Sequence, residues 1–403
     1  MSKPTLSDLI VAYVREADAA VTDTVRSAAA RVPAFAARLA GAGIDPAAVR
    51  GAADLDRLPI LAKDDLLAAQ RAAPPFGGAV APDAVVRKIF CSPGPLYEPQ
   101  LAGPDPWRWG ESLRAAGIGA GDRVLNCFSY HLSPAGAMFE EGCLALGAAV
   151  IPAGIGNQDL QVQVAAEAGA TAYVGLPSYL KALIDKAGER GLAWSIERAL
   201  VTAEPLPDSL RAELEPHVPV VLMAYGTAEA GLLGYETAPR SGLRLPAGVL
   251  VQICDLDSGA SRTDDSVGQV VVTLLRPELP LIRFGTGDLS AWRLAADGSL
   301  RLAGVLGRLG EAVKVRGLFL HPRQAAAALE RLPGLAGYRF VIGRVSHQDT
   351  LRCEIVAAPG AEPEALASAV RERIRAALRF TADVSCVTEL PKGPALVDER
   401  DWK

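Results

Sequence analysis

The sequence predicts an α/β fold: a large N-terminal domain with mostly parallel sheets and a β subdomain, and a small C-terminal α+β domain. Three observations carry this prediction. Strand-like and helix-like segments alternate between residues 106 and 200, short strands and turns replace them near residue 235, and a β-α-β-β-α-β order follows residue 307. The first pattern is typical of parallel sheets with crossover helices, and the last of a split-βαβ domain.

The first 200 residues supply helices and the expected parallel strands. Residues 1 to 70 are alanine-rich with helical periodicity, in VTDTVRSAAARVPAFAARLAGAG and then DLDRLPILAKDDLLAAQ. From residue 106, helix-like WRWGESLRAAG, MFEEGCLALG, LQVQVAAEAG and SYLKALIDKAGERG alternate with strand-like VLNCF, AAVIPAG, TAYVGL and IERALVTAE. Sheets of this kind bind ligands beyond the carboxyl ends of their strands, so we expect the functional site there.

Near residue 235 the sequence pattern changes from alternating strands and helices to short strands and turns. Residues of about 235–306 contain AGVLVQICDLDSG, GQVVVTLL, LIRFGTGDLSAWR and LRLAGVLG, which predict an antiparallel β subdomain. Beyond them, helix-like RQAAAALERL and PEALASAVRERIRAAL alternate with strand-like GYRFVIG, TLRCEIVAA and DVSCVTEL. We therefore expect domains at 1–306 and 307–403, with the boundary near residues 307 to 310.

Composition and charge exclude several classes of protein. The 403 residues carry 46 acidic and 41 basic side chains, for a net charge of −5, so nucleic acid and anionic membrane are poor partners. No apolar run reaches the ~18 residues that span a bilayer, and the N-terminus lacks a signal peptide, which predicts a cytoplasmic protein. The six cysteines and four histidines are scattered, which predicts reduced thiols and argues against a His/Cys metal site.

Two stretches carry groups that suit nucleotide binding. MAYGTAEAG (223–231) places an aromatic ring, a glycine, a hydroxyl and a carboxylate within five residues, which suits a purine, a phosphate and Mg²⁺. A strand end followed by a polar turn explains it equally well. RPELPLIRFGTGDLS (276–290) sets Asp288 on a Gly-Thr-Gly turn, where it could accept two ribose hydroxyls or satisfy nearby backbone amides.

Two further stretches are weaker. GRLGEAVKVRG (307–317) offers Arg308 to a ribose or phosphate and places Lys314 and Arg316 on one strand face, although a solvated strand edge also explains these charges. LVTAEPLPDSL (200–210) ends an expected strand in the turn TAEP.

The segment CSPGPLYEPQ (91–100) must turn, because proline fixes φ and glycine permits positive φ. It lacks the lysine and the second glycine of the G-x-x-x-x-G-K-[ST] phosphate loop. Taken alone, it favours a structural turn over a ligand site.

In their order and spacing, these stretches resemble the adenylate-forming enzymes, the acyl-CoA synthetases and their relatives, and within them the phenylacetate–CoA ligase branch. LPILAKDDL, GAGDRV, VIPAGIGNQDLQVQV, LPSYL and AEP add to the likeness, which runs from about residue 40 to the end. The resemblance implies ATP, Mg²⁺ and coenzyme A as cofactors and a small-molecule carboxylic acid as substrate, and it is compatible with a homodimer.

The resemblance also implies roles for individual residues. CSPGPLYEPQ becomes a diverged phosphate loop, Tyr225 would stack near adenine, and Asp288 would bind the ribose hydroxyls. The implied cofactor-binding residues are Ser92, Gly94, Ala203, Glu204, Pro205, Tyr225, Gly226, Thr227, Asp288 and Arg308. The implied catalytic residues are Thr227, Glu229 and Lys392, with Glu229 also the Mg²⁺ ligand. The implied acyl pocket contains Phe128, Tyr130, His131, Ala153, Gly154 and Gly156, although Tyr130 and His131 could equally be packed aromatics at a strand end.

The chain departs from the family pattern at two places: the hinge before the small C-terminal domain and the C-terminal lysine that this domain carries. The hinge position falls at 309–311, where Gly310 stands in place of the family's frequent acidic residue. At the C-terminus, TELPKGPALVDERDWK gives Lys392 the spacing of the family's adenylation lysine when counted back from Asp398. Counted forward from LP, that lysine is missing and Lys392 is an exposed residue in a proline turn.

We therefore expect an ATP-dependent carboxylate–CoA ligase that activates an aryl or arylacetic acid as acyl-AMP and transfers it to coenzyme A. Transfer to a carrier-protein thiol or an amine is one alternative. A nucleotide- or acyl-adenylate-binding protein that has lost turnover is another.

Overall fold

A computed structural model describes residues 4–92, 96–309, 313–316, 318–320, 322–329, 332–378 and 380–400. The chain forms two compact units, Met1–Leu309 and Gly310–Lys403, each described here by itself. In the described part of the chain, no helix has both the length and the apolar character to cross a bilayer.

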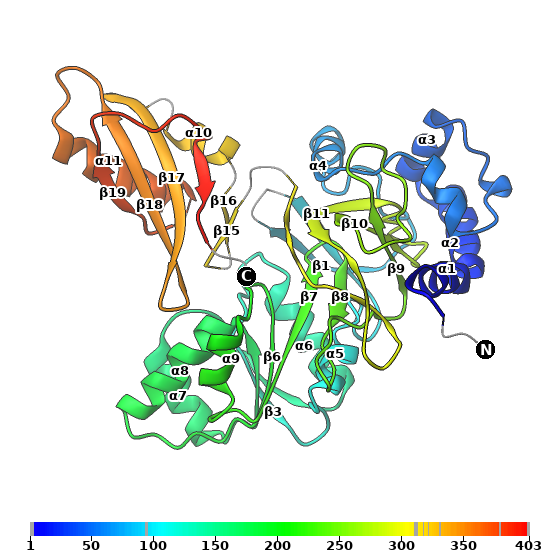
Figure 1. Ribbon diagram of the computed structural model, residues 1–403, viewed down its shortest axis with the longest axis horizontal. Helices are drawn as coiled ribbons and strands as arrows, with labels where there is room; N and C mark the ends of the chain where they lie inside the picture. Colours follow the sequence, from blue (N-terminus) through cyan, green and yellow to red (C-terminus); the bar gives the residue numbers. More distant parts are fainter. Residues whose placement is uncertain are drawn as a thin grey trace. The chain divides into compact units, whose positions relative to one another are not determined.

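The large unit begins with helices that pack beside its β subdomain (Figure 1). They are α1 (Leu6–Glu16), α2 (Asp18–Arg31), α3 (Pro33–Gly41), η1 (Pro46–Ala48), η2 (Ala52–Arg57) and α4 (Lys63–Ala72). Thr5 starts α1 with a capping box, because its Oγ1 accepts from the amide of Asp8 while its own amide donates to the Asp8 carboxylate. Buried Val25 and Phe35 pack with Ile282 of the β subdomain.

Two polar contacts fix these helices to the β subdomain. The guanidinium of Arg283, only 2% exposed, forms an ion pair with the carboxylate of Asp56. The amide of Val251 donates to the Tyr13 hydroxyl at 2.9 Å. The N-terminal segment is therefore part of the large unit rather than an appendage.

A six-stranded sheet forms the centre of the large unit, in the order β4-β3-β5-β6-β7-β8. The strands are β3 (Arg123–Asn126), β4 (Ala149–Ile151), β5 (Ala172–Gly175), β6 (Arg198–Val201), β7 (Val220–Thr227) and β8 (Gly231–Tyr235). The first five are parallel and β8 is antiparallel to β7. The parallel sheet expected between residues 106 and 200 is therefore confirmed.

Helices cover both faces of this sheet, as the apolar character of its strands requires. The helices are α5 (Gly110–Ala115), α6 (Ala135–Ala145), α7 (Gln158–Glu167), α8 (Pro177–Glu189) and α9 (Asp208–Leu214). Successive strand residues point to opposite faces. Val124 therefore packs with α5 and α6, while its neighbour Leu125 packs with α7, α8 and α9.

The β subdomain is antiparallel, with the four-stranded order β14-β11-β10-β9. Its strands are β9 (Val249–Cys254), β10 (Gly268–Leu274), β11 (Phe284–Ser290) and β14 (Gly307–Arg308). Two hairpins complete the unit: β1 (Val86–Ser92) with β2 (Leu96–Leu101), and β12 (Trp292–Leu294) with β13 (Leu300–Leu302). The antiparallel strands expected after residue 235 thus correspond to these pairs.

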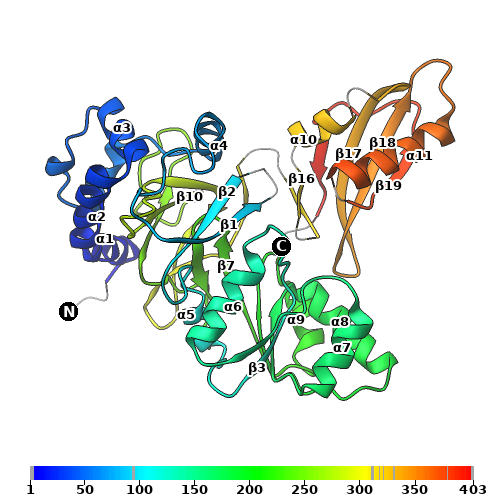
Figure 2. The same ribbon diagram turned by 180° about the vertical axis from the view of Figure 1, so that it is seen from behind.

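The second unit is an α+β structure around a sheet of order β19-β18-β17-β20 (Figure 2). Its elements are β15 (Val313–Val315), β16 (Leu318–Leu320), α10 (Pro322–Leu329), β17 (Leu335–Val345), β18 (Gln348–Ala357), α11 (Pro363–Arg373), η3 (Ile374–Leu378), β19 (Asp383–Cys386) and β20 (Leu396–Asp398). The strand expected before α10 forms a separate hairpin, β15 with β16, and β20 occupies an edge of the sheet beside β17.

Asp349 anchors the C-terminal end of this unit. Its carboxylate accepts from Arg344 at 2.9 Å and from Arg400 at 2.8 Å, and Arg400 also pairs with Asp398 of β20. The side chains of Asp349 and Arg400 are each only 2% exposed. Arg316 directly follows β15 and is exposed, and its Nε donates to the Asp349 carbonyl oxygen. The Lys314 side chain lies outside the described part of the structure.

Candidate active site

The MAYGTAEAG segment forms the end of β7, a turn, and the start of β8. Gly226 is required there, because a Cβ at this position would lie 2.4 Å from the carbonyl oxygen of Gly231 and 2.8 Å from the Trp109 ring. Thr227 Oγ1 accepts from the amide of Ala230 at 3.1 Å, which closes the turn that carries Glu229. The local sequence therefore fixes Tyr225, Thr227 and Glu229 at one end of β7.

Buried Tyr225 and Asp288 and half-buried Arg308 form a network across three strands. The Tyr225 hydroxyl donates to Asp288 Oδ2 at 2.8 Å, and Arg308 Nε donates to Asp288 Oδ1 at 2.7 Å. Burial and the Asp288 charge raise the pKa of Tyr225 well above its usual value, so the phenol keeps its proton. The structure therefore joins three residues that the sequence connected only through the expected nucleotide.

Glu229 forms an ion pair with Lys63, whose Nζ lies 2.6 Å from Glu229 Oε1. The side chain of Glu229 is 3% exposed and that of Lys63 is 45% exposed. Burial opposes ionisation of Glu229, but the charge and hydrogen bond of Lys63 outweigh it and lower the pKa of the carboxyl group. Burial and the charge of Arg308 act to lower the pKa of Lys63, but the charge and hydrogen bond of Glu229 outweigh them, so the net shift is upward.

The sequence prediction did not assign a role to Lys63. Its stretch, LPILAKDDL, contributes only to the family resemblance, although the expected phosphate loop lacks a lysine. Lys63 is the first residue of α4, and its pairing with the β7–β8 turn joins segments that are distant in the chain. The missing lysine of the phosphate loop was the available signal that another part of the chain supplies this charge.

The expected phosphate loop connects β1 to β2. Ser92 ends β1, while Gly94 lies outside the described residues. The Ser92 hydroxyl donates at 2.8 Å to Oε1 of Glu98, a residue to which the sequence prediction gave no role. Burial and the nearby Glu229 charge raise the pKa of Glu98 to about 8, although Ser92 and Lys63 act against this shift. A second buried carboxyl group therefore lies beside Glu229.

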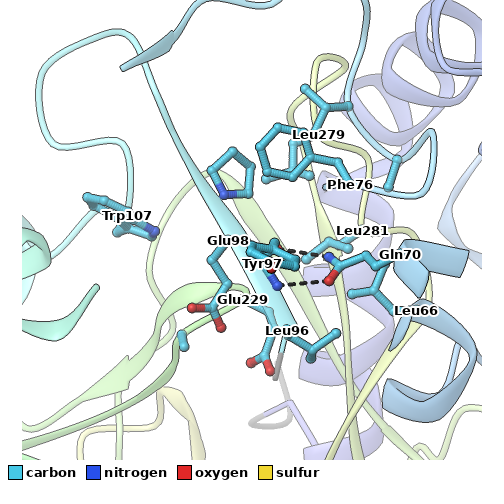
Figure 3. Close-up of a pocket in the computed structure, with 14 residues that line it drawn as sticks. Leu66, Gln70, Phe76, Leu96, Tyr97, Glu98, Trp107, Glu229, Leu279 and Leu281 are labelled. Atoms are coloured by element: carbon cyan, nitrogen blue, oxygen red, sulfur yellow. Dashed lines mark hydrogen bonds between the residues drawn. The ribbon is translucent and has the colours of Figure 1, made fainter. Parts of the chain in front are cut away.

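Glu98 and Glu229 line one cavity between α4, the β1–β2 hairpin and the β7–β8 turn (Figure 3). Its other walls are mainly apolar and include Leu66, Phe76 and Trp107. The volume is ≈ 30 Å³, which suits one or two waters or a small ion rather than an acyl group.

The chain's fit to Mg²⁺ can be judged from these carboxylates. Across the described residues, no group of three or more His, Cys, Asp and Glu side chains is placed to hold a metal. Glu98 Oε2 is buried and receives no hydrogen bond from the described residues. A buried acceptor of this kind, beside Glu229, fits a cation whose other ligands come from water and substrate phosphates.

The TAEP turn follows β6. Ala203 has φ +73°, a left-handed conformation that is uncommon for a residue with a Cβ. Glu204 Oε2 accepts from the Ser178 hydroxyl at 2.5 Å, and Pro205 is half-buried beside it. The structure thus places Ala203, Glu204 and Pro205 at the carboxyl end of a parallel strand, while their contact with adenine remains a prediction.

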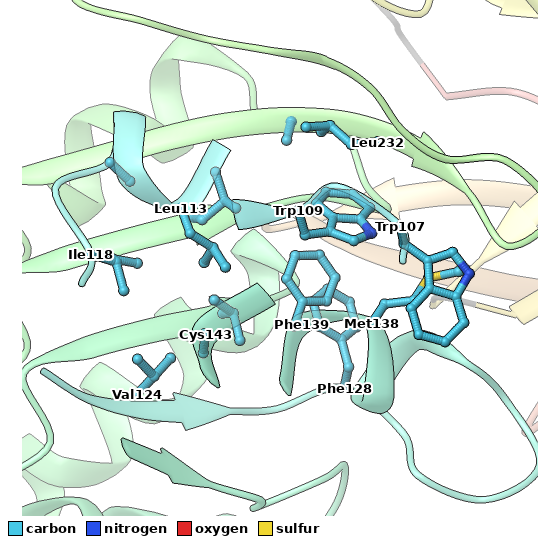
Figure 4. Packing of buried hydrophobic residues seen from close by; sticks show 14 of the residues in the cluster. Trp107, Trp109, Leu113, Ile118, Val124, Phe128, Met138, Phe139, Cys143 and Leu232 are labelled. Carbon is cyan, nitrogen blue, oxygen red and sulfur yellow. The ribbon is translucent and has the colours of Figure 1, made fainter. Parts of the chain in front are cut away.

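The expected acyl-pocket residues are distributed over several environments. Phe128 is buried and stacks on Phe139, with ring centroids 4.5 Å apart (Figure 4). The Tyr130 hydroxyl accepts from Asn126 Nδ2 at 2.8 Å, and His131 is exposed. His131 is therefore not a packed core aromatic.

The other three expected pocket residues belong to the loop after β4. Gln161 Nε2 donates to the carbonyl oxygens of Ala153 and Gly154, and the Tyr179 hydroxyl bonds to the backbone of Gly156. None of the six expected pocket residues lines the cavity beside Glu229. Their role in binding an acid remains a prediction.

Lys392 belongs to the second unit. It is exposed in the segment between β19 and β20, which agrees locally with both interpretations of the tail. Its role in adenylation remains a prediction.

Comparison with known proteins shows which enzymes the chain is similar to. A model of the AMP-binding enzyme family matches residues 108–273. The phenylacetate-coenzyme A ligase of Thermus thermophilus is 29% identical over 91% of this chain and 89% of its own length. That of Aromatoleum evansii is 28% identical over 90% of this chain and 87% of its own length.

Solved structures support the fold. A 2-hydroxyisobutyryl-CoA ligase, in complex with 2-HIB-AMP and CoA, has a TM-score of 0.83 and 23% sequence identity, covering 96% of this chain and 90% of that chain. The relatives span both units, and the family model spans α5 to β9, including the β7–β8 turn that carries Glu229. Residues 108–273 therefore match the AMP-binding enzyme family, and the whole chain is similar to phenylacetate-coenzyme A ligases, as its sequence motifs predicted.

Proposed function

We propose that this enzyme joins a carboxylic acid to coenzyme A in two steps, through an acyl-adenylate formed from ATP. The observation that carries the proposal is the pairing of two neighbouring groups in the large unit. The Tyr225–Asp288–Arg308 network suits a ribose, and the Lys63–Glu229 pair suits phosphates and their cation. The phenylacetate-coenzyme A ligases among its relatives support coenzyme A as the acceptor.

In the first step, a carboxylate oxygen of the acid attacks the α-phosphorus of ATP. The new O–P bond forms while the bond to the bridging oxygen of the β-phosphate breaks, and pyrophosphate leaves. Asp288 holds the ribose, which positions the α-phosphate near Thr227. Lys63 supplies positive charge that the phosphate loop lacks, and Mg²⁺ held by Glu229 would neutralise charge on the phosphate oxygens.

In the second step, the thiol of coenzyme A attacks the acyl carbon of the adenylate. A C–S bond forms, the C–O bond to AMP breaks so that AMP leaves, and the thiol proton passes to solvent water. We assign Lys392 to the first step, where its ammonium would contact the α-phosphate. This assignment rests on its spacing before Asp398 and on its exposure ahead of β20.

We assign an aryl or arylacetic acid as the substrate class, because the four curated relatives are phenylacetate-coenzyme A ligases. Phe128, Tyr130, His131 and the 153–156 loop remain the proposed acyl-binding residues. A cytoplasmic location and a homodimer are retained as proposals from composition and from the resemblance.

The test measures pyrophosphate release with Mg-ATP across aryl, arylacetic and short aliphatic acids, with and without coenzyme A. Wild type is compared with Lys63→Met, Lys392→Ala and the control Lys186→Ala; the Lys186 ammonium pairs with Glu189 on α8. Acid-dependent release that falls about 100-fold in Lys63→Met and Lys392→Ala, but not in the control, is expected from the loss of one charge contact.

Coenzyme A should convert a single burst into steady turnover. Turnover with an added amine or a carrier protein, but not with coenzyme A, would identify that molecule as the acceptor instead. No acid-dependent release from the wild type would contradict the proposed function.

A further inference from the structure

Two buried carboxyl groups from different elements line the cavity beside the phosphate-loop hairpin. Glu98 of β2 is 4% exposed, and Glu229 of the β7–β8 turn is 7% exposed. Figure 3 shows both side chains at the same end of the cavity. Two acids buried side by side are unfavourable unless a cation or a proton compensates them.

The described residues do not satisfy every oxygen of this pair. Glu98 Oε1 accepts from the Ser92 hydroxyl, whereas Glu98 Oε2 is buried and receives no hydrogen bond from the residues that the structure describes. Glu229 Oε1 meets the Lys63 ammonium at 2.6 Å. A buried acceptor without a donor, near a carboxylate already paired to a cation, indicates a place for a further positive charge or a water.

We propose that Glu98 and Glu229 together form a two-carboxylate site for a divalent cation, and that the Lys63 ammonium occupies this site when the cation is absent. The inference rests on the proposed function, which gives Glu229 the Mg²⁺ role. The inference adds two points to that function: Glu98 is a second ligand of the cation, and the cation exchanges with the Lys63 ammonium. Mg²⁺ and Mn²⁺ match this chemistry, because one or two carboxylates plus substrate phosphates and waters are the usual ligands of such ions.

The surrounding structure holds the carboxylates and leaves room for the exchange. Gln70 of α4 bonds twice to the backbone of Tyr97, donating to its carbonyl oxygen and accepting from its amide, each at 2.8 Å. This fixes β2, and hence Glu98, against the helix that carries Lys63. Because 45% of the Lys63 side chain is exposed, part of it already meets solvent, and a change of side-chain rotamer would move the ammonium away from Glu229 while α4 stays in place.

The experiment measures binding of Mn²⁺ alone to the full-length, nucleotide-free protein, from the amplitude of the free Mn²⁺ signal in electron paramagnetic resonance. The variants are Glu98→Gln, Lys63→Met and the control Glu141→Gln. Glu141 accepts from Gln100 of the same hairpin, so its substitution makes the same change of charge nearby. Circular dichroism confirms that each variant is folded.

Glu98→Gln should weaken Mn²⁺ binding by at least about tenfold, as loss of a metal-site group does. Lys63→Met should strengthen binding, because the competing ammonium is gone, and Glu141→Gln should bind like the wild type. A Glu98→Gln protein with wild-type affinity, or a wild type that leaves Mn²⁺ free, overturns the site. Weaker binding by Lys63→Met overturns the exchange.

Pyrophosphate release, measured on the same preparations, separates this inference from the proposed function. Acid-dependent release by the wild type, together with unchanged Mn²⁺ binding by Glu98→Gln, overturns the two-carboxylate site alone. Absence of release with every acid contradicts the proposed function, whatever Mn²⁺ does.

Discussion

The substitution Asp288→Asn tests whether the buried network on β11 binds the ribose of ATP. The carboxylate already accepts one hydrogen bond from Arg308 and one from Tyr225, a different oxygen for each. An ionised carboxylate has about four acceptor positions, so about two remain for the 2′- and 3′-hydroxyls. The existing bonds therefore orient Asp288 without using up its capacity.

The expected magnitude follows from the charge of the acceptor. A hydrogen bond to a charged group contributes about 1.5–3 kcal/mol, so wild type should bind 2′-deoxy-ATP about 10- to 150-fold more weakly than ATP. The asparagine amide is neutral and has a single acceptor oxygen, so the discrimination should fall below about tenfold.

Isothermal titration of ATP and 2′-deoxy-ATP into both proteins gives the two affinity ratios. The control is Asp297→Asn, which neutralises an aspartate in the β12–β13 turn whose side chain is 49% exposed. Because a ratio is compared within each variant, a general loss of stability does not imitate the effect. Equal discrimination by wild type and Asp288→Asn would refute the ribose assignment.

Two further predictions concern stability. Asp349→Asn should lower the free energy of unfolding of the second unit by about 3 kcal/mol in urea titrations, because it removes the charge of a buried carboxylate that pairs with Arg344 and Arg400; a loss below about 1 kcal/mol contradicts this. Burial raises the pKa of Tyr13 to about 12. The contribution of Tyr13 to the free energy of unfolding is therefore complete below pH 10 and is lost as the pH rises from 10 through 12. The deficit of Tyr13→Phe, about 1 kcal/mol from the lost Val251 bond, should therefore shrink over this range in unfolding measurements, and a constant deficit would contradict the shift.

The main features of the fold could be predicted because they depend on local patterns. Neighbouring apolar residues such as Val124 and Leu125 are both buried, one on each face of the sheet, so the buried strands appear in the sequence as continuous apolar runs. The edge strand β20 was not predicted. Its three residues, Leu396–Asp398, are too few to show a strand pattern in the sequence. They become a strand because they pair with β17, which lies much earlier in the chain.

The candidate site was predicted where its residues fall in one short segment. Tyr225, Thr227 and Glu229 follow one another at a strand end, so their grouping required no knowledge of distant contacts. Lys63 and Glu98 were missed because their functional surroundings arise from tertiary packing. A lysine at the start of a helix and a glutamate in a hairpin have no distinguishing local pattern.

The contacts between the N-terminal helices and the β subdomain have a consequence for synthesis on the ribosome. Asp56 and Arg283 are 227 residues apart. At about 5–20 residues per second, the ribosome needs roughly 10 to 45 s to make the second member of this pair after the first. During that interval Val25 and Phe35 lack Ile282, against which they are buried in the finished protein. The helices that emerge first thus complete their packing late, and a nascent chain arrested before residue 283 should expose their apolar surface to chaperones.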